Sequence, residues 1–184
     1  MTSSASIPVA DLQSQLQARL APFTALDSCH AQVMEHLRHL QQLLQRLERD
    51  GVDEEARRLA QAITAFFETE ARHHHEEEER LVFPALLGGT DLELVRQVQR
   101  LQMDHGWLEE DWRELALQLS AVAEGYSWYD LDALRAGIEV FTALYHDHIA
   151  LEESLIYPQA RQALADEVAG VGRRLAAQRR AYAP

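Results

Sequence analysis

Four of the nine histidines are spaced so that they could bind a metal ion together. Each pair of neighbours along the chain is centred on a run of helix-breaking residues, with midpoints at Val52, between Gly89 and Thr90, and between Tyr126 and Ser127. Residues equidistant from a turn lie at the same height in an up-and-down helical bundle. The spacing therefore places four imidazoles in one layer: His30, His74, His105 and His148.

The sequence that follows two of these histidines is repeated. Each is followed by two glutamates at the fourth and fifth positions and by an aromatic residue and a proline at the ninth and tenth. The two sets are Glu78, Glu79, Phe83 and Pro84 after His74, and Glu152, Glu153, Tyr157 and Pro158 after His148. His30 and His105 share the spacing of their apolar neighbours in the same way. The chain is therefore predicted to form two helical hairpins, each contributing one single histidine and one His-x-x-x-Glu pair.

Helical periodicity runs through nearly the whole chain, and glycines and prolines cluster at the proposed boundaries. We expect helices at about 23–49, 53–86, 91–124 and 129–164, which makes an all-α, up-down-up-down four-helix bundle. Residues 1–22 would be an N-terminal segment with a short amphipathic helix, and residues 165–184 a basic C-terminal tail. Pro84 and Pro158 fall inside the ends of the second and fourth helices, where each should kink or stop its helix.

The apolar stripe of each helix indicates which histidines point inward. The four layered histidines each continue a stripe that steps by three and four residues, and Glu78 and Glu152 continue the stripes of the second and fourth helices. His73 and His75 are each rotated by about 100° from His74, so the run of three histidines is expected to hold one ligand. The other histidines fall off the stripes: His36, His39 and His146.

Burying these groups together would be unfavourable without a cation. An uncompensated buried polar group costs on the order of 2 to 7 kcal/mol, and an unpaired charge costs more. Glu78 and Glu152 lie one turn beyond their histidines, about 6 Å along the axis, so the two carboxylates could bridge two cations. A donor set of nitrogen and oxygen without sulfur favours iron or manganese over copper(I) or a structural zinc, and iron is preferred.

From about residue 23 to residue 157 the chain resembles hemerythrin-like proteins, also called HHE cation-binding domains. The resemblance rests on the histidine spacing and on the segments HEEEERLVFPAL and HIALEESLIYPQA, which begin at His74 and His148. It implies a non-haem di-iron centre with these two histidines as terminal ligands and with Glu78 and Glu152 as bridging ligands. Two residues match the remaining single-histidine positions of the family: His30 and His105.

One position departs from the family pattern. Oxygen-carrying hemerythrins have a second histidine four residues after the one on the third helix, where this chain has Glu109, and this weakens a carrier role. By turn symmetry Glu109 lies level with Glu70, and either could ligate the metal or accept a hydrogen bond from a ligand imidazole. Tyr145 lies on the inner stripe near the same layer, where its hydroxyl could serve a bound ligand or its ring could simply pack in the core.

The number of ligands leaves room for an exchangeable molecule. Four histidines and two bridging carboxylates supply eight bonds, whereas two six-coordinate irons need about twelve. An oxo or hydroxo bridge would supply two more, and dioxygen, nitric oxide, peroxide or water could supply the rest. Large apolar side chains would wall the site: Phe66, Phe67, Trp112, Ile138 and Phe141.

Composition limits the setting of such a site. The 184 residues carry a net charge of −13, which argues against a nucleic-acid or anionic-membrane partner. Cys29 is the single cysteine, which excludes an internal disulfide and an all-thiolate metal site. No stretch is long and apolar enough to span a bilayer, and the first ten residues lack the pattern of a signal peptide, so a soluble cytoplasmic protein is expected.

Three functions from different classes stay open. The first, which we favour, is a module that binds or senses dioxygen, nitric oxide, peroxide or the iron and redox state without turnover. The second is an enzyme, either a di-iron oxidoreductase or a stress protein similar to those that repair iron centres. The third is a structural bundle whose metal only holds the helices together. A ferritin-type oxidase is disfavoured because its paired Glu-x-x-His segments are missing.

Overall fold

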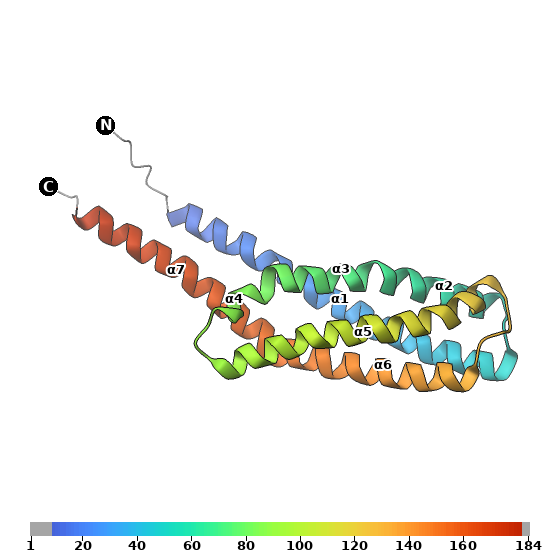
Figure 1. Cartoon of the computed structure of the whole chain (residues 1–184). Helices are drawn as coiled ribbons and strands as arrows, with labels where there is room; N and C mark the ends of the chain where they lie inside the picture. The colour runs from blue at the N-terminus through green and yellow to red at the C-terminus, as the bar shows by residue number, and fades with distance from the viewer. Residues whose placement is uncertain (1–8, 182–184) are drawn as a thin grey trace.

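The computed structural model of the chain describes residues 9–181, which are helical over almost their whole length. The first long helix is α1 (Val9–Asp50) and the third is α5 (Leu92–Glu124). The second is built from α2 (Glu54–Glu68), α3 (Glu70–Glu77), the π-helical turn η1 (Glu78–Val82) and α4 (Pro84–Leu87). The fourth is built from α6 (Leu131–Leu151), the π-helical turn η2 (Glu152–Ile156) and α7 (Tyr157–Ala181). The four run up, down, up and down, which confirms the predicted all-α bundle (Figure 1).

The turns between the long helices lie where the sequence predicted them. Gly51 and Gly125 follow the ends of α1 and α5 with φ angles of +71° and +89°, a backbone region that glycine enters without steric cost. Each following helix is capped by an aspartate, because Asp53, Asp91 and Asp130 accept hydrogen bonds from the first free backbone N–H groups of α2, α5 and α6. Local sequence therefore sets the length of each long helix and so the height of every side chain on it.

Both expected prolines follow a π-helical turn. Proline has no N–H and its ring clashes with the carbonyl four residues earlier, so the backbone widens just before it. The N–H of Phe83, directly before Pro84, donates to the carbonyl of Glu78 at 2.9 Å, five residues back. Past Pro84 only the short helix α4 follows, whereas Pro158 does not stop its helix, since α7 continues to Ala181.

The two ends of the bundle differ from the sequence-based expectation. The short N-terminal helix is instead the beginning of α1, which runs unbroken from Val9, and residues 165–181 continue α7 rather than forming a separate tail. These two stretches lie side by side beyond the bundle (Figure 1) and are joined by an ion pair of 2.6 Å between Arg19 and Glu167. Each stretch therefore gains a helical partner that local sequence patterns could not indicate.

The core is divided into two apolar clusters with a polar layer between them. One cluster fills the end of the bundle near the α1–α2 and α5–α6 turns and includes Leu37, Ile63 and Phe141. The other lies toward α4 and α7 and includes Phe83 and Leu101. In sequence, each layered histidine falls between a residue of one cluster and a residue of the other. The histidine layer is thus enclosed at both ends by apolar side chains.

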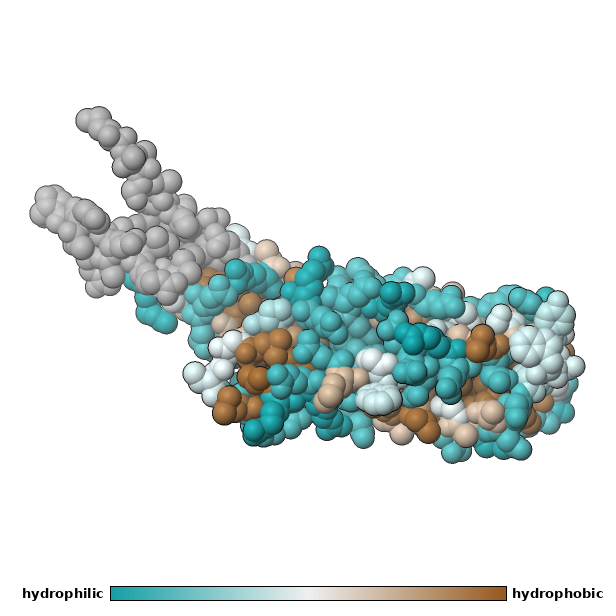
Figure 2. Space-filling view, in the orientation of Figure 1, coloured by the Kyte–Doolittle hydropathy of each residue, from teal (hydrophilic) through white to brown (hydrophobic). Residues whose placement is uncertain are grey.

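The exterior of the bundle is mostly hydrophilic. Figure 2 shows hydrophilic side chains over most of the visible face, with separate hydrophobic patches between them. Among the helices of residues 9–181, none is long and apolar enough to cross a membrane. The apolar residues of these helices are directed mainly into the interior.

Candidate metal centre

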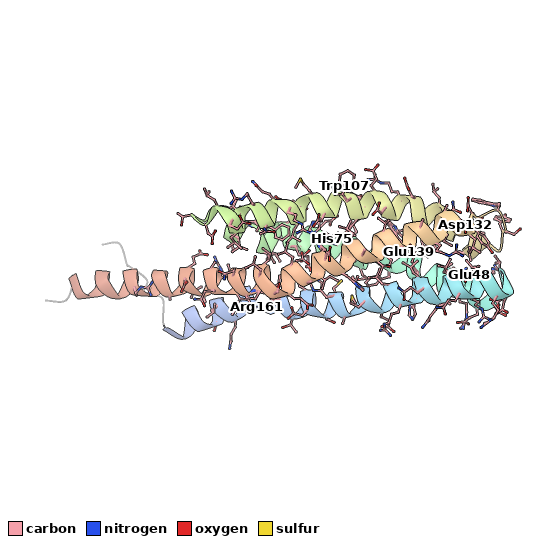
Figure 3. The ribbon with its side chains drawn as sticks, turned by 90° about the horizontal axis from the view of Figure 1, so that it is seen from below. Glu48, His75, Trp107, Asp132, Glu139 and Arg161 are labelled. Atoms are coloured by element: carbon pink, nitrogen blue, oxygen red, sulfur yellow. The ribbon has the colours of Figure 1, made fainter. Side chains whose placement is uncertain are left out.

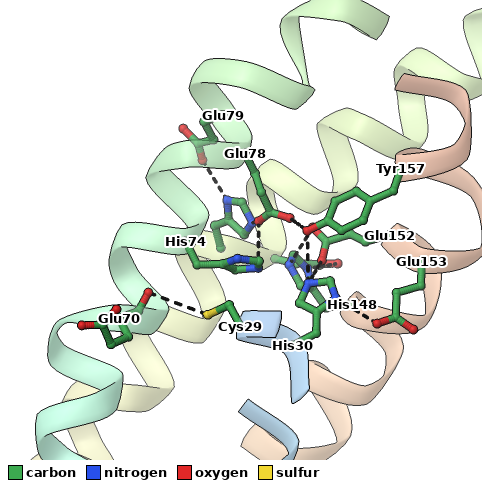
Figure 4. Close-up of polar contacts among 12 residues, drawn as sticks. Cys29, His30, Glu70, His74, Glu78, Glu79, His148, Glu152, Glu153 and Tyr157 are labelled. Carbon is green, nitrogen blue, oxygen red and sulfur yellow. Dashed lines mark hydrogen bonds and ion pairs between the residues drawn. The ribbon is translucent and has the colours of Figure 1, made fainter. Parts of the chain in front are cut away.

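The six residues that the sequence assigned to metal all meet in the buried layer (Figure 4). Each long helix contributes one histidine, and the two π-helical turns contribute the glutamates: His30 from α1, His74 from α3, His105 from α5, His148 from α6, Glu78 from η1 and Glu152 from η2. None of these side chains is more than 6% exposed. Turn-centred spacing therefore brings the imidazoles of four helices into contact, with ring centres 4.8 Å apart for His30 and His74 and 4.9 Å apart for His105 and His148.

The potential ligand atoms fall into two groups that share one carboxylate. Within each group the atoms lie within 4.8 Å of one another; the groups are His30, His74, Glu78 and Glu152, and His75, Glu78, His105 and His148. Glu152 also reaches both groups, because its Oε2 lies 3.1 Å from Nε2 of His30 and its Oε1 lies 3.1 Å from Nε2 of His148. Both carboxylates are thus placed between two clusters of imidazole nitrogens.

His75 was expected to point away from the layer, and this expectation is wrong. Its ring stacks on that of His105 with centres 4.1 Å apart, and its Nε2 is buried without a hydrogen-bond partner. Figure 3 shows His75 inside the bundle, with Trp107 on the outer side of α5. His75 follows a break in the helix at Thr69, whose N–H bonds to the carbonyl of Phe66 instead of the one four residues back.

His75 lies at the edge of the inner face of α3. The inner face of α3 and η1 includes Ala71, His74, His75 and Glu78. Their spacing is that of a wide inward-facing stripe on a helix. The side chain of His73 is 63% exposed and lies near Glu76 and Glu77 of its own helix, so it points away from the layer as the sequence predicted. Two of the three consecutive histidines therefore face the layer.

Among residues 9–181, the buried layer holds polar atoms that make no well-aligned hydrogen bond, although the Glu152 oxygens lie 3.1 Å from imidazole nitrogens. They include Nδ1 of His74, Nε2 of His75, Nε2 of His105, both ring nitrogens of His148, Oε2 of Glu78 and both carboxylate oxygens of Glu152. The large majority of buried side-chain polar atoms in folded proteins are hydrogen-bonded. A bound cation would satisfy these atoms at once, so the residues present fit a metal site.

Further carboxylates hold the outer nitrogens of the imidazoles. Nδ1 of His30 lies 3.0 Å from Oε1 of Glu153, and Nδ1 of His105 lies 2.9 Å from Oε1 of Glu79. A carboxylate can only accept, so these bonds keep the proton on Nδ1 and leave Nε2 directed at the layer. The sequence repeat already contained Glu79 and Glu153, although they were given no role. Each belongs to one hairpin and holds the single histidine of the other.

Asp104 is a further carboxylate that sequence reasoning missed. Its Oδ2 lies 3.9 Å from Nδ1 of His148, and the residue is 8% exposed. A position next to His105 is the only sequence feature that could have pointed to it. Asp104 adds negative charge on the outer side of His148 and so increases the attraction of this layer for cations.

Tyr157 is the second residue that the sequence did not single out as part of the site. Its hydroxyl donates to Oε1 of Glu78 and lies 3.2 Å from Nε2 of His30, and its ring stacks on His30 with centres 5.3 Å apart. Burial raises the pKa of Tyr157 far above its ordinary value, so the hydroxyl keeps its proton. The repeat has Phe83 at the matching position, stacked on His105, so one half of the layer carries a hydroxyl that the other half lacks.

Comparison with known proteins agrees with this geometry. The family model of the hemerythrin HHE cation-binding domain matches residues 21–160. The chain belongs to the hemerythrin HHE family. It is also similar to an uncharacterized protein of Haemophilus influenzae, with 31% identity over 159 residues that cover 86% of this chain and 90% of that protein. The matched residues include every histidine and glutamate of the two groups, and this HHE domain is a cation-binding one.

Electrostatics in the HHE layer is dominated by Glu152. Burial alone would raise its pKa, but the facing His148 and His30 hold the pKa of this carboxylate well below its usual range. For His148 the directions are reversed: burial alone would lower its pKa, but the Glu152 carboxylate raises the pKa to about 10. Burial and then the charge of Glu152 raise the pKa of Glu78 to about 7, and burial with the neighbouring imidazoles lowers that of His74 to about 3. Without a cation, protons therefore balance the negative charge of the layer.

Glu70 and Glu109, which were considered as additional ligands, lie outside both groups. The side chain of Glu70 is exposed, and only its backbone carbonyl points inward, where it accepts a weak hydrogen bond of 4.0 Å from Sγ of Cys29. Glu109 is 51% exposed and pairs with Arg113 on its own helix at 3.5 Å. In this HHE domain the extra imidazole of oxygen-carrying relatives is therefore not replaced by Glu109, whereas His75 brings a fifth imidazole to the layer from α3.

Tyr145 and Cys29 border the HHE layer without joining either group. The Tyr145 ring is buried, with its centre 6.0 Å from that of His75 and 6.4 Å from that of His148. Burial raises the pKa of Tyr145 far above its ordinary value and raises the pKa of the Cys29 thiol to about 12. Both groups therefore stay protonated at neutral pH, and the Cys29 thiol is not a ready metal ligand.

Proposed function

We propose that this HHE domain holds two non-haem iron ions and uses them to bind or sense a small ligand. The observation that carries the proposal is the division of the buried donors into two groups that share Glu78 and are both contacted by Glu152. One ion would be held by His30 and His74, the other by His75, His105 and His148, and Glu78 and Glu152 would bridge them. When bound, such an iron pair, with an oxo or hydroxo bridge, supplies reversible redox chemistry and exchangeable coordination positions.

The ligand count differs between the two sides of the layer. Three imidazoles face one group and two face the other. With both carboxylates shared, the group of His30 and His74 is one protein ligand short of its neighbour. This shortage favours the His30 side as the place where dioxygen, nitric oxide or peroxide would be bound.

A cavity lies on the outer side of His30. It has a volume of about 430 Å³, opens between α1 and α6 and reaches His30 and Glu153. Met34 and Ile149 supply apolar wall, and a small neutral molecule passes such a wall more readily than an ion does. Glu153, which is 54% exposed and bonded to His30, connects the layer with solvent at the same place.

The net charge of −13 disfavours nucleic acid or an anionic membrane as a partner of the protein. We place the protein in the cytoplasm. Turnover by a di-iron oxidoreductase or a repair protein, and a purely structural metal, are the competing functions. A structural metal alone would not need an incomplete ligand set on one side of the layer.

An optical spectrum of the purified, iron-loaded protein tests this function. We expect absorption in the near-ultraviolet and visible range that is absent from the iron-free protein, disappears on reduction, and changes when nitric oxide or dioxygen is added to the reduced protein. Continued consumption of dioxygen or peroxide would identify an enzyme. A spectrum that none of these molecules alters would show a structural metal and contradict the proposal.

A further inference from the structure

A second and larger cavity reaches the other side of the layer. It has a volume of about 1000 Å³, lies between α2 and α3 on one side and α5 on the other, and has α6 residues as its floor. Its inner end is formed by His75 and His105, the two stacked imidazoles. Pockets for small organic molecules have volumes of roughly 300–1000 Å³. Dioxygen or nitric oxide would fill only a small part of this cavity.

The walls of this cavity are made of fixed aromatic rings. Phe67, Trp112, Phe141 and Tyr145 line it, and each is less than 9% exposed. The ring centres of Phe67 and Trp112 are 4.9 Å apart, those of Phe67 and Phe141 are 5.1 Å apart, and those of Phe141 and Tyr145 are 4.9 Å apart. Because these rings pack on one another, they give the inner side of the cavity a rigid apolar lining.

The charges at the cavity indicate the charge of its ligand. Four glutamates and two arginines line the cavity: Glu68, Glu76, Glu79, Glu109, Arg72 and Arg113. Each arginine lies 3.5 Å from a glutamate of its own helix, Arg72 from Glu76 and Arg113 from Glu109. The two remaining carboxylates leave the cavity with an excess of negative charge, which disfavours an anionic ligand.

We propose that this cavity binds an uncharged aromatic molecule against the His75 and His105 side of the layer. The aromatic residues supply an apolar lining, the volume is large enough for a molecule of two or three rings, and the excess of carboxylates selects against acids. The site is separate from the opening at His30. Its occupancy would bring an organic molecule next to a ligand imidazole of the proposed metal centre, and to that extent its role rests on the proposed function.

Gly106 gives a way to close the cavity without disturbing the core. It lines the cavity on α5, and a Cβ built at this position would meet no atom within 4 Å. Gly106→Phe would therefore place a ring in the space that the ligand needs, and Gly106→Ala would leave most of that space open. Met103→Phe adds a similar ring on the same helix at a residue that is 61% exposed and does not line the cavity.

The test is a fluorescence titration with the neutral probe N-phenyl-1-naphthylamine on iron-loaded and iron-free protein. We expect saturable binding of one probe per chain, a Kd raised at least about tenfold by Gly106→Phe, and little change with Gly106→Ala or Met103→Phe. The anionic analogue 8-anilinonaphthalene-1-sulfonate should bind at least about tenfold more weakly than the neutral probe. No saturable binding, or equal binding by Gly106→Phe and wild type, would overturn the site, and equal or tighter binding of the anion would overturn the proposed ligand class.

Iron content, measured on the same samples, separates this inference from the proposed function. Gly106→Phe should retain the iron of the wild type and lose only the probe. Wild-type protein that binds the probe but takes up no iron would contradict the metal proposal and leave the cavity proposal standing.

Discussion

At the scale of single residues, the centre is built from imidazoles held between two carboxylates. His30 lies between Glu152 on its inner nitrogen and Glu153 on its outer one, and His105 lies between Glu78 and Glu79 in the same way. Because each pair of glutamates comes from the opposite hairpin, the repeat in the sequence is also a set of contacts that joins the two hairpins. Ligand orientation therefore depends on both halves of the bundle.

His75 and His73 give the sharpest contrast between neighbouring residues. His75→Ala should lower the iron content that the protein retains against a chelator, because it removes one of the three imidazoles of its group. His73→Ala should leave the iron content unchanged, since that ring is exposed. Elemental analysis of both variants, with circular dichroism to confirm the fold, decides the matter, and equal iron contents would contradict the role given to His75.

The outer glutamates should affect metal affinity although they touch no metal. Glu153→Gln removes the negative charge beside Nδ1 of His30 but keeps the size of the side chain. Loss of such an orienting partner typically weakens metal binding about 10- to 100-fold. Competition with a chelator would measure this change, and Glu76→Gln, an exposed position on α3, is the matched control. An unchanged affinity in Glu153→Gln would show that the carboxylate does not orient the ring.

Metal binding should depend on pH. The pKa of His148 is raised to about 10 by Glu152 in the cation-free layer, so this ring carries a proton at neutral pH that an incoming ion must displace. Proton and metal compete for the same ring, and affinity should therefore rise with pH until the proton is lost near that pKa. Titration of the iron-free protein with ferrous ion in weak buffer at pH 7, followed with a pH indicator, should show proton release. Absence of release would contradict this charge balance.

At the scale of helices, the sequence predicted the turns better than the helix interiors. Gly51, Gly125 and the capping aspartates act locally, so their effect could be deduced from neighbouring residues alone. The inward face of α3 could not be deduced in this way, because the buried stripe runs through Phe67 and Ala71, whereas Glu70, which was considered as a ligand, is exposed. In the fourth helix, the π-helical turn η2 shifts the inward positions that follow it, so extrapolation of the stripe did not single out Tyr157.

Capping of α6 gives a prediction at this scale. Asp130 accepts hydrogen bonds of 3.0 Å from the backbone N–H groups of Asp132 and Ala133. Asp130→Ala should lower the free energy of unfolding by about 1 kcal/mol, whereas Asp130→Ser, which can still cap, should retain most of it. Urea unfolding of the iron-free variants measures the difference. Equal losses in both variants would show that the stabilisation comes from something other than capping.

At the scale of the whole molecule, a polar layer is held between two apolar clusters. The sequence predicted the height of this layer, because each predicted turn lies midway between two histidines. It did not predict that the beginning of α1 and the end of α7 extend beyond the bundle as a pair, since long-range packing fixes that arrangement. The apolar clusters position the ligands but do not satisfy their buried nitrogens and oxygens, and this is the physical reason to expect cations there.

The most direct test is anomalous diffraction at the iron absorption edge from crystals of the iron-loaded protein. We predict two iron peaks in each chain, one next to His30 and His74 and the other next to His75, His105 and His148, with Glu78 and Glu152 between them. A single peak, or none within reach of these side chains, would contradict the account.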